Sequence, residues 1–228
     1  MANIVELRQI EKIYKGAGNV QVLFGINLSF EAGSFNSIIG QSGSGKTTLL
    51  NIIGTLDRPT RGEVIIAGRR TDKLSKDKLA EVRNEIIGFV FQFHFLLPEF
   101  TARENVLMPY WIQPRHPRKE ILKRADELFD LVGMSKFKNK LAVRLSGGQQ
   151  QRTAIIRALI NQPRIILADE PSGNLDTENT NAIYKIFRDI NRDFGTTFII
   201  VTHDRRIAEQ TDRIVEIRDG RIVMDIKR

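Results

Sequence analysis

A glycine-rich loop between an aliphatic strand and a helix is the feature that most restricts how this chain can fold. Residues 40–47 read Gly-Gln-Ser-Gly-Ser-Gly-Lys-Thr, after an aliphatic stretch at 35–39 and before a helical pattern at 46–53. The glycines allow backbone N–H groups to wrap around phosphates, Lys46 supplies a cation to the β and γ groups, and the Thr47 hydroxyl can bind Mg²⁺. The sequence therefore predicts a nucleoside triphosphate site formed by Gly40, Ser42, Gly43, Ser44, Gly45, Lys46, Thr47 and Thr48.

Two carboxylates follow another aliphatic strand further along the chain. Residues 165–168 are Ile-Ile-Leu-Ala, and Asp169 and Glu170 come directly after them. Because a strand this apolar is expected to be buried beside the phosphate loop, Asp169 can hold Mg²⁺ and Glu170 can orient and polarise an attacking water. The pair predicts transfer of a phosphoryl group to water rather than nucleotide binding alone.

A second glycine-rich segment lies between these two motifs. It consists of Leu145, Ser146, Gly147, Gly148 and Gln149, and it has the size and glycine content of a loop that opens a helix. The free N–H groups at such a helix start attract phosphate. One nucleotide site cannot use both glycine-rich segments, so we expect this one to face a nucleotide held by a second subunit.

Strands and helices alternate along most of the chain, which predicts an α/β domain with a mostly parallel sheet. No strong strand pattern appears from 93 to 162, and we interpret this stretch as a helical insertion into a core formed by 1–92 and 163–228. Thr101 and Glu104 predict a capping box within it. The expected strands are residues 4–7, 20–30, 35–39, 62–67, 86–91, 164–168, 197–201, 214–217 and 222–224, and the expected helices are residues 46–53, 76–83, 101–110, 118–132, 146–160 and 179–193.

Composition excludes several kinds of site. The 228 residues include no cysteine, so disulfides, zinc–thiolate sites and thiol nucleophiles are excluded. The longest apolar runs fall well short of the ~20 residues needed to cross a bilayer, so we expect a cytosolic protein unless a partner holds it at a membrane. The net charge of +8 comes from basic residues spread along the chain, which we interpret as solvated surface, with anionic lipid as the better functional interpretation.

With these motifs together, the chain resembles the ATP-binding subunit of ATP-binding cassette (ABC) transporters over essentially its whole length. The resemblance implies a phosphate-loop NTPase (RecA-like) core with an antiparallel β subdomain and the helical insertion. It also implies that residues 145–149 are the family signature, which contacts the γ-phosphate of ATP held by the other subunit. Two copies would then bind head to tail around two ATP molecules and Mg²⁺, and would drive integral membrane subunits from the cytoplasmic side of the inner membrane.

The resemblance assigns roles to single residues as well. Gln92 corresponds to the glutamine that senses Mg²⁺ and the attacking water, and His203 corresponds to the histidine that contacts the γ-phosphate. Tyr14 corresponds to the aromatic residue that stacks on adenine. The implied catalytic residues are Glu170, His203, Gln92 and Lys46, and the implied metal contacts are Thr47, Gln92 and Asp169.

The remaining implied contact lies after the carboxylate pair. Residues 172–176 occupy the place of the loop that crosses the dimer interface, and Asp176 is its implied nucleotide contact, although Asn174 stands where alanine is usual. His94 and His116 match no catalytic position, and we expect both to be structural or exposed.

Local sequences narrow the choice within the family. Residues 51–62 and 171–176 are similar to the branch that contains lipoprotein-release, macrolide-export and cell-division ATPases, and residues 91–101 are especially similar to the lipoprotein-release ATPases. Lipoprotein release is therefore the leading hypothesis, with macrolide or peptide efflux and cell-division regulation as alternatives. No nucleic-acid partner is expected, because the ABC ATPases of ribosomes and DNA repair carry a second cassette or long coiled coils that do not fit 228 residues.

Overall fold

A computed structural model describes residues 2–16, 18–173 and 175–228 of the chain. The strands are β1 (Asn3–Tyr14), β2 (Val20–Glu31), β3 (Phe35–Ile39), β4 (Arg61–Ile66), β5 (Arg69–Arg70), β6 (Ile87–Phe91), β7 (Ile165–Asp169), β8 (Thr197–Val201), β9 (Arg213–Arg218) and β10 (Arg221–Lys227). The helices are α1 (Lys46–Ile53), α2 (Lys76–Ile86), α3 (Ala102–Ile112), α4 (Arg118–Leu131), α5 (Gly147–Leu159), α6 (Thr177–Phe194) and α7 (Arg205–Ala208), with short 3₁₀ turns at Ser135–Phe137 and Ala142–Arg144.

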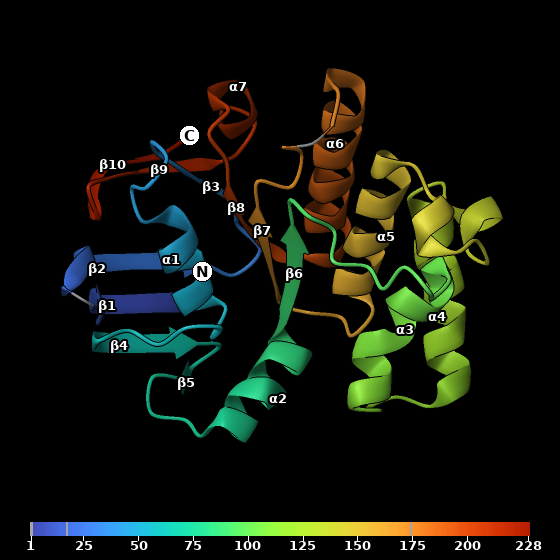
Figure 1. Ribbon diagram of the computed structural model, residues 1–228, viewed down its shortest axis with the longest axis horizontal. Coiled ribbons are helices and arrows are strands. Elements are labelled where there is room, and N and C mark those ends of the chain that lie inside the picture. The colour runs from blue at the N-terminus through green and yellow to red at the C-terminus, as the bar shows by residue number, and fades with distance from the viewer. Residues whose placement is uncertain (1, 17, 174) are drawn as a thin grey trace.

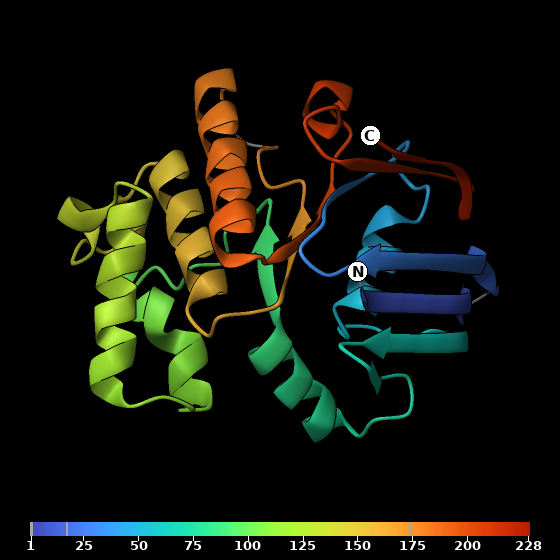
Figure 2. The same cartoon turned by 180° about the vertical axis from the view of Figure 1, so that it is seen from behind.

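The strands form two sheets in the described part of the chain. The smaller sheet has the order β2-β1-β4-β5, and the larger has the order β10-β9-β3-β8-β7-β6. Figure 1 shows the smaller sheet at one end of the molecule and helices α3, α4 and α5 at the other. Seen from behind in Figure 2, the central strands again lie between these two ends.

The larger sheet is parallel except at one edge. β6, β7, β8, β3 and β9 run in the same direction, and β10 pairs antiparallel with β9. Phe91 pairs with Asp169, and Asp169 pairs with Val201. Val201 in turn pairs with Ile38, so the carboxyl ends of these neighbouring strands lie level with one another. The loops that leave them meet at one edge of the sheet, which is where ligands bind in open α/β folds.

The central strands are mostly apolar because both of their faces are covered. In β8, Phe198 and Ile200 enter the core on the side of α3, α4, α5 and α6. The alternate residues, Ile199 and Val201, enter the core that contains α1 and the smaller sheet. None of these four side chains is more than 1% exposed. Residues 198–201 therefore form an uninterrupted apolar run, which is why the sequence predicted this strand.

The smaller sheet is antiparallel, but its first strand is longer than the predicted segment 4–7. β1 continues to Tyr14 and pairs with both β2 and β4. Register shifts fall between Leu7 and Lys12, and Gln9 has a φ of 51°, so the apolar alternation is interrupted within the strand. The short elements β5 and α7 were not predicted either, because two and four residues are too few to establish a period.

The helices at the other end pack around a shared apolar core. Thr101 caps α3 through a capping box with Glu104, as predicted, and Ser146 caps α5 through a capping box with Gln149. Among the helices of the described residues, none is long and apolar enough to span a lipid bilayer.

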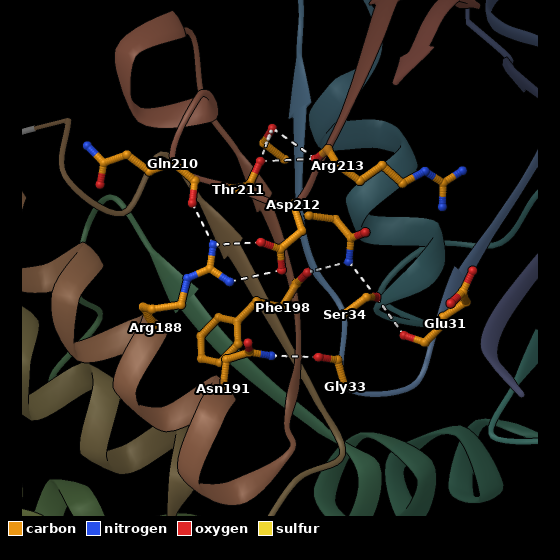
Figure 3. A network of polar contacts seen from close by, with 12 residues as sticks. Glu31, Gly33, Ser34, Arg188, Asn191, Phe198, Gln210, Thr211, Asp212 and Arg213 are labelled. Atoms are coloured by element: carbon orange, nitrogen blue, oxygen red, sulfur yellow. Dashed lines mark hydrogen bonds and ion pairs between the residues drawn. The ribbon is translucent and has the colours of Figure 1, made fainter. Parts of the chain in front are cut away.

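A network of polar contacts fixes α6 to the segments that precede β3 and β9 (Figure 3). The Arg188 guanidinium donates to both carboxylate oxygens of Asp212, at 2.9 and 3.0 Å, and also to the carbonyl of Gln210. Three residues further along α6, Asn191 Nδ2 donates to the carbonyl of Gly33 at 2.8 Å. The position of α6 on the sheet is therefore fixed by directional contacts in addition to apolar packing.

Gly88 sets the distance between α5 and the larger sheet. It lies in β6, where an added Cβ would overlap the carbonyl oxygen of Ala158 in α5 and come within 2.5 Å of Ile166 Cδ1. Its φ is not in the left-handed region, so the need for glycine here is steric. Because α5 begins with the second glycine-rich segment, this close approach determines where that segment lies relative to the sheet.

Gly88→Ala is expected to lower the free energy of unfolding by about 1–3 kcal/mol, the usual cost of extra volume in a packed interior. Gly16→Ala is the matched control, because among the described residues a Cβ there would meet only Gly18 O, at 3.8 Å. The control should change stability by less than about 0.5 kcal/mol. Urea unfolding followed by circular dichroism measures both variants, and equal stability of the two would contradict the steric role.

Candidate functional site

The loop after β3 is shaped by glycines. Gly40, Gly43 and Gly45 have φ values of 151°, 78° and 102°, which favour glycine over other residues. At Gly40, an added Cβ would also collide with the carbonyl oxygen of Ile217 in β9. The main chain can therefore turn tightly into α1 and expose its N–H groups directly to a ligand.

The start of α1 fits a bound anion. Gly45 is its N-cap residue and provides no side-chain hydrogen bond, and no acidic residue lies in the first turn. N–H groups in the first turn of a helix have no acceptor within the helix, and together with the helix dipole they attract phosphate. Ser44 Oγ is also buried without a hydrogen-bond partner in the described structure. These donors match the needs of a polyphosphate.

Lys46 places a cation inside the same loop. Its side chain is almost fully buried, and Nζ donates to the carbonyl oxygens of Gly40 and Gln41 at 2.9 and 2.8 Å. A buried ammonium requires such partners, because burial without them is unfavourable. The charge is therefore held where the phosphates of a nucleotide would lie.

Asp169 ends β7 and lies opposite the first turn of α1. Thr47 Oγ1 donates to Asp169 Oδ1 at 3.4 Å. Burial raises the pKa of Asp169 above its ordinary value and the charge of Glu170 raises it further, whereas the Thr47 hydroxyl and Lys46 lower it. A carboxylate and a hydroxyl that face each other are suitable Mg²⁺ ligands.

The metal would not be enclosed by protein groups alone. Across the described ranges, no group of three or more acidic, histidine or cysteine residues is arranged to hold a metal ion. Mg²⁺ is usually held by one or two carboxylates together with substrate phosphates. The pair Thr47 and Asp169 therefore fits Mg²⁺ that arrives with a nucleotide.

Glu170 and His203 form a pair next to these groups. His203 Nδ1 lies 2.9 Å from Glu170 Oε2, and the two side chains are 74% and 21% exposed, respectively. Glu170 has a φ of 46°, a left-handed conformation that costs a residue other than glycine about 1–3 kcal/mol. Its N–H donates to the carbonyl of Val201 at 3.0 Å, which holds the backbone in this turn. The turn brings the carboxylate to the imidazole.

One open cleft gathers these residues. Gln92 enters it from the end of β6, and Gly173 lies directly against this side chain, because an added Cβ would come within 2.7 Å of Gln92 Nε2. The predicted site residues that line the cleft are Ser42, Gly43, Gly45, Lys46, Thr47, Thr48, Gln92, Asp169, Glu170 and His203. The level ends of β3, β6, β7 and β8 bring these segments together.

Tyr14 lies at the end of β1, and two residues that the sequence analysis did not identify hold it in place. Its hydroxyl donates to Asp57 Oδ2 at 2.9 Å, and Lys12 Nζ lies 4.7 Å from the ring centroid. Burial raises the pKa of the Tyr14 hydroxyl, while its hydrogen bond with Thr48 lowers it. The contact with Thr48 places the ring beside the cleft, and 42% of the residue remains exposed.

The second glycine-rich segment is separate from this cleft, whose lining in the described residues includes none of positions 145–149. Ser146 Oγ accepts from the Gln149 N–H at 3.4 Å, so the serine side chain serves the helix cap. Gly148 packs on the start of α6, because an added Cβ would come within 2.8 Å of Asn179 Oδ1. The geometry therefore agrees with the expectation that the phosphate loop and residues 145–149 of one chain do not share a nucleotide site.

Asp176 is the N-cap of α6 and is bound to the same asparagine. Its carboxylate accepts from Asn179 N at 2.8 Å and from Asn179 Nδ2 at 2.9 Å. These hydrogen bonds lower the pKa of Asp176. Asn179 thus connects Asp176 to Gly148, whereas Asn174, in the same loop, lies outside the described residues.

His94 contacts the main chain of two site segments. Nε2 lies 2.9 Å from the carbonyl oxygen of Gly147, and Nδ1 lies 3.2 Å from that of Gln92. The residue is half-buried, in agreement with the expected structural role. His116, which shares that expectation, is half-buried in the loop between α3 and α4.

The sequence analysis missed Lys12, Asp57 and Asn179, which support the site. Lys12 precedes Tyr14 by two positions, so a longer predicted strand would have placed both on one face. Asn179 lies three residues after Asp176, the position that an N-cap carboxylate contacts. Asp57 is 43 residues from Tyr14, and no local pattern indicates their contact.

Comparisons with known proteins agree with this geometry. The chain matches the family described as ABC transporter over residues 23–173. The lipoprotein-releasing system ATP-binding protein LolD 1 of Rhodopseudomonas palustris is 50% identical over 224 residues, which covers 97% of this chain and 99% of that protein. The lipoprotein-releasing system ATP-binding protein LolD of Aquifex aeolicus is 46% identical over 228 residues and covers 100% of both chains.

Solved structures are similar over the same length. The dimeric structure of MJ0796, a bacterial ABC transporter cassette, has a TM-score of 0.90 and 42% identity, covering 98% of each chain. The post-hydrolysis state of MJ0796 bound to ADP and Pi has a TM-score of 0.90 and 43% identity, with the same coverage. These likenesses confirm the predicted ABC ATPase fold. Its sequence and its fold together place this chain in the ABC transporter family.

Proposed function

We propose that this chain is the ATP-hydrolysing subunit of an ABC transporter that releases lipoproteins from the inner membrane. The observation that carries the proposal is the Glu170–His203 pair, in the same cleft as Lys46 and Thr47. Hydrolysis of a phosphoanhydride requires a carboxylate that can accept a proton from water and a cation that can neutralise the phosphate. This cleft holds both groups.

Binding of ATP uses the groups already described. The N–H groups of the loop and of the first turn of α1 surround the phosphates, Lys46 neutralises the β and γ groups, and Tyr14 stacks on adenine. Thr47, Asp169 and Gln92 would hold Mg²⁺, which would supply positive charge against the phosphate oxygens.

Hydrolysis then depends on Glu170. Its carboxylate accepts a proton from water as the water oxygen attacks the γ-phosphorus, and the bond from that phosphorus to the bridging oxygen of ADP breaks. His203 keeps the carboxylate oriented and contacts the γ-phosphate. Because Glu170 is held by its backbone turn and by His203, little reorganisation is needed at the moment of reaction.

Two copies of the chain complete the sites. The signature residues Leu145, Ser146, Gly147, Gly148 and Gln149 do not contribute to the cleft of their own copy in the described residues, and the similar cassette MJ0796 is a dimer. In a head-to-tail dimer, the N–H groups at the start of α5 face the γ-phosphate bound by the other copy. Asp176 lies at the same interface. ATP then closes the dimer and hydrolysis opens it.

An apolar groove supports attachment to an integral membrane subunit at the cytoplasmic side of the inner membrane. It lies between the core and the helices, and its lining includes Leu56, Phe89, Phe91, Pro109 and Ile112. Ile112 is 75% exposed, and Leu56 is 49% exposed. Exposed apolar side chains gathered along a groove are typical of a protein contact site.

The helical segment between β6 and β7 is proposed as a signature subdomain. It spans residues 93–162, carries α3, α4 and α5, and interrupts the core formed by 1–92 and 163–228. The segment adds helices to an apolar cluster that it shares with β7, β8 and α6, and Gly88 keeps α5 close to the core.

The substrate assignment depends on the relatives. Identities of 46–50% over nearly the whole chain favour lipoprotein release over the alternatives of macrolide or peptide efflux and cell-division regulation. All of these use the same ATPase chemistry and differ in the membrane partner. The partner therefore decides between them.

Glu170→Gln is expected to bind ATP but hydrolyse it at least about 100-fold more slowly, because the amide cannot accept the proton from water. ATP should then trap a dimer that is visible by size-exclusion chromatography. Glu127→Gln makes the same change at an exposed position of α4 and should retain full activity. Phosphate release at saturating ATP measures both rates, and near-normal turnover by Glu170→Gln would remove this carboxylate from the role of base.

Lys46→Ala should reduce ATP affinity by about 10–100-fold, because charge-assisted hydrogen bonds to the phosphates are lost. Isothermal titration calorimetry with Mg-ATP measures the change. Lys185→Ala, at an exposed position of α6, removes the same charge outside the cleft and should bind like the parent. Unchanged affinity of Lys46→Ala would contradict the proposed phosphate loop.

Affinity purification of the tagged chain from gently solubilised membranes should recover a membrane subunit with bound lipoprotein, identified by mass spectrometry. Ile112→Asp should lose this partner, because a charge in the apolar groove opposes docking. Val223→Asp places the same charge on β10 and should keep the partner. Recovery of an efflux or division partner would replace the lipoprotein assignment and leave the ATPase chemistry in place.

A further inference from the structure

His94 connects two segments that the proposed function assigns to different ATP molecules. The chain that leaves β6 crosses α5 on its way to α3 (Figure 1). Within this crossing, His94 Nε2 is 2.9 Å from the carbonyl oxygen of Gly147 and Nδ1 is 3.2 Å from that of Gln92. Gln92 lines the cleft of its own copy, whereas Gly147 belongs to the signature. One side chain thus spans from the cleft loop to the start of α5.

The contact with Gly147 also restricts a neighbouring N–H group. A peptide unit is planar, so the Gly147 carbonyl and the Gly148 N–H turn together. A carbonyl oxygen has two acceptor sites, so it can accept from His94 while it also serves the helix. The imidazole therefore influences the direction of an N–H that, in the proposed dimer, faces the ATP of the other copy.

Arg157 of α5 also binds the main chain of this loop. Its guanidinium donates to the carbonyl oxygens of His94 and Phe95 at 2.7 and 2.6 Å. The Phe95 ring meets the Phe91 ring edge-on, with 5.4 Å between their centroids. The main chain of the loop is thus tied to α5 and one of its rings to β6, which gives a shift of Gln92 a path to the signature segment.

We propose that His94 is a positioning residue that couples the two ATP sites of the dimer. The inference rests on the proposed function, because it requires a signature that acts on the ATP of the other copy. ATP bound in one cleft sets the position of Gln92, and His94 passes that position to the peptide between Gly147 and Gly148. His94 contacts main chain and takes no part in the chemical step.

Two variants separate the hydrogen bond from the bulk of the ring. In His94→Gln, the side-chain amide nitrogen lies about as far along the side chain as Nε2, so it can still donate to Gly147. In His94→Asn, the amide nitrogen lies about where Nδ1 is and does not reach that carbonyl. Each is made in the Glu170→Gln background, where ATP is expected to hold the dimer closed. His116→Asn is the control for the same substitution elsewhere.

Dimer dissociation constants are measured by analytical ultracentrifugation with saturating Mg-ATP. His94→Asn is expected to weaken the dimer by about tenfold, in the range of a lost hydrogen bond. His94→Gln and His116→Asn should match the parent. A fluorescent ATP analogue, titrated at protein concentrations below dimer formation, should bind all of these variants equally, because His94 acts on the ATP of the other copy.

The coupling role would be overturned if His94→Asn kept the dimer affinity of the Glu170→Gln parent. It would also be overturned if His94→Asn and His94→Gln weakened the dimer equally, which would assign the effect to the bulk of the ring. A fall in the nucleotide affinity of the single copy that accounts for the weaker dimer would overturn it too, and would assign the effect to the cleft of the same copy. If Glu170→Gln itself did not dimerise with ATP, the head-to-tail dimer of the proposed function would fail first. The behaviour of Glu170→Gln alone therefore distinguishes failure of the proposed dimer from failure of the His94 coupling.

Discussion

The level carboxyl ends of β6, β7, β8 and β3 are the constraint on which the rest of the structure depends. A slip of one residue in any of these pairings would exchange the two faces of a strand and move its functional end along the sheet. Polarity opposes such a slip chiefly in β3, where the buried side chains of Asn36 and Ser37 are hydrogen-bonded, because the middle residues of β6, β7 and β8 are apolar on both faces. Size opposes it: a slip of β6 would replace Gly88 against Ala158 with a larger residue, and a slip of β8 would take Phe198 out of its place in the core.

The two glycine-rich segments present backbone N–H groups in different ways. At 40–45, left-handed glycines force the main chain into a fixed cradle around the buried ammonium of Lys46. At 145–149, Ser146 and Gln149 cap the helix while Gly148 allows close contact with Asn179. The first segment is rigid because of its backbone, and the second takes its position from neighbours on β6, α6 and the loop of His94. A segment positioned by its neighbours can respond when they move, which a rigid cradle does not do.

Local patterns predicted most of the fold and most of the residues that line the cleft. The phosphate loop, the capping box at Thr101 and the acidic end of β7 each depend on residues that are adjacent in sequence. β1 was predicted too short because Gln9 interrupts its alternation. The contacts of Tyr14 with Asp57 and of His94 with Gly147 join residues 43 and 53 positions apart, so only the folded chain reveals them. The roles of Lys46, Thr47, Asp169 and Glu170 came from their motifs, those of Gln92, His203 and Tyr14 came from the family resemblance, and all of them stay predictions.

The backbone of Glu170 places stability and chemistry in opposition. Its φ of 46° suits glycine, and glycine at this position would relieve about 1–3 kcal/mol of strain. The same change would remove the carboxylate beside His203. Selection for a more stable fold alone would therefore favour the loss of glutamate here, as is common where an active site is strained. Glutamate in this strained turn is therefore explained by the chemistry proposed for its carboxylate and not by the stability of the fold.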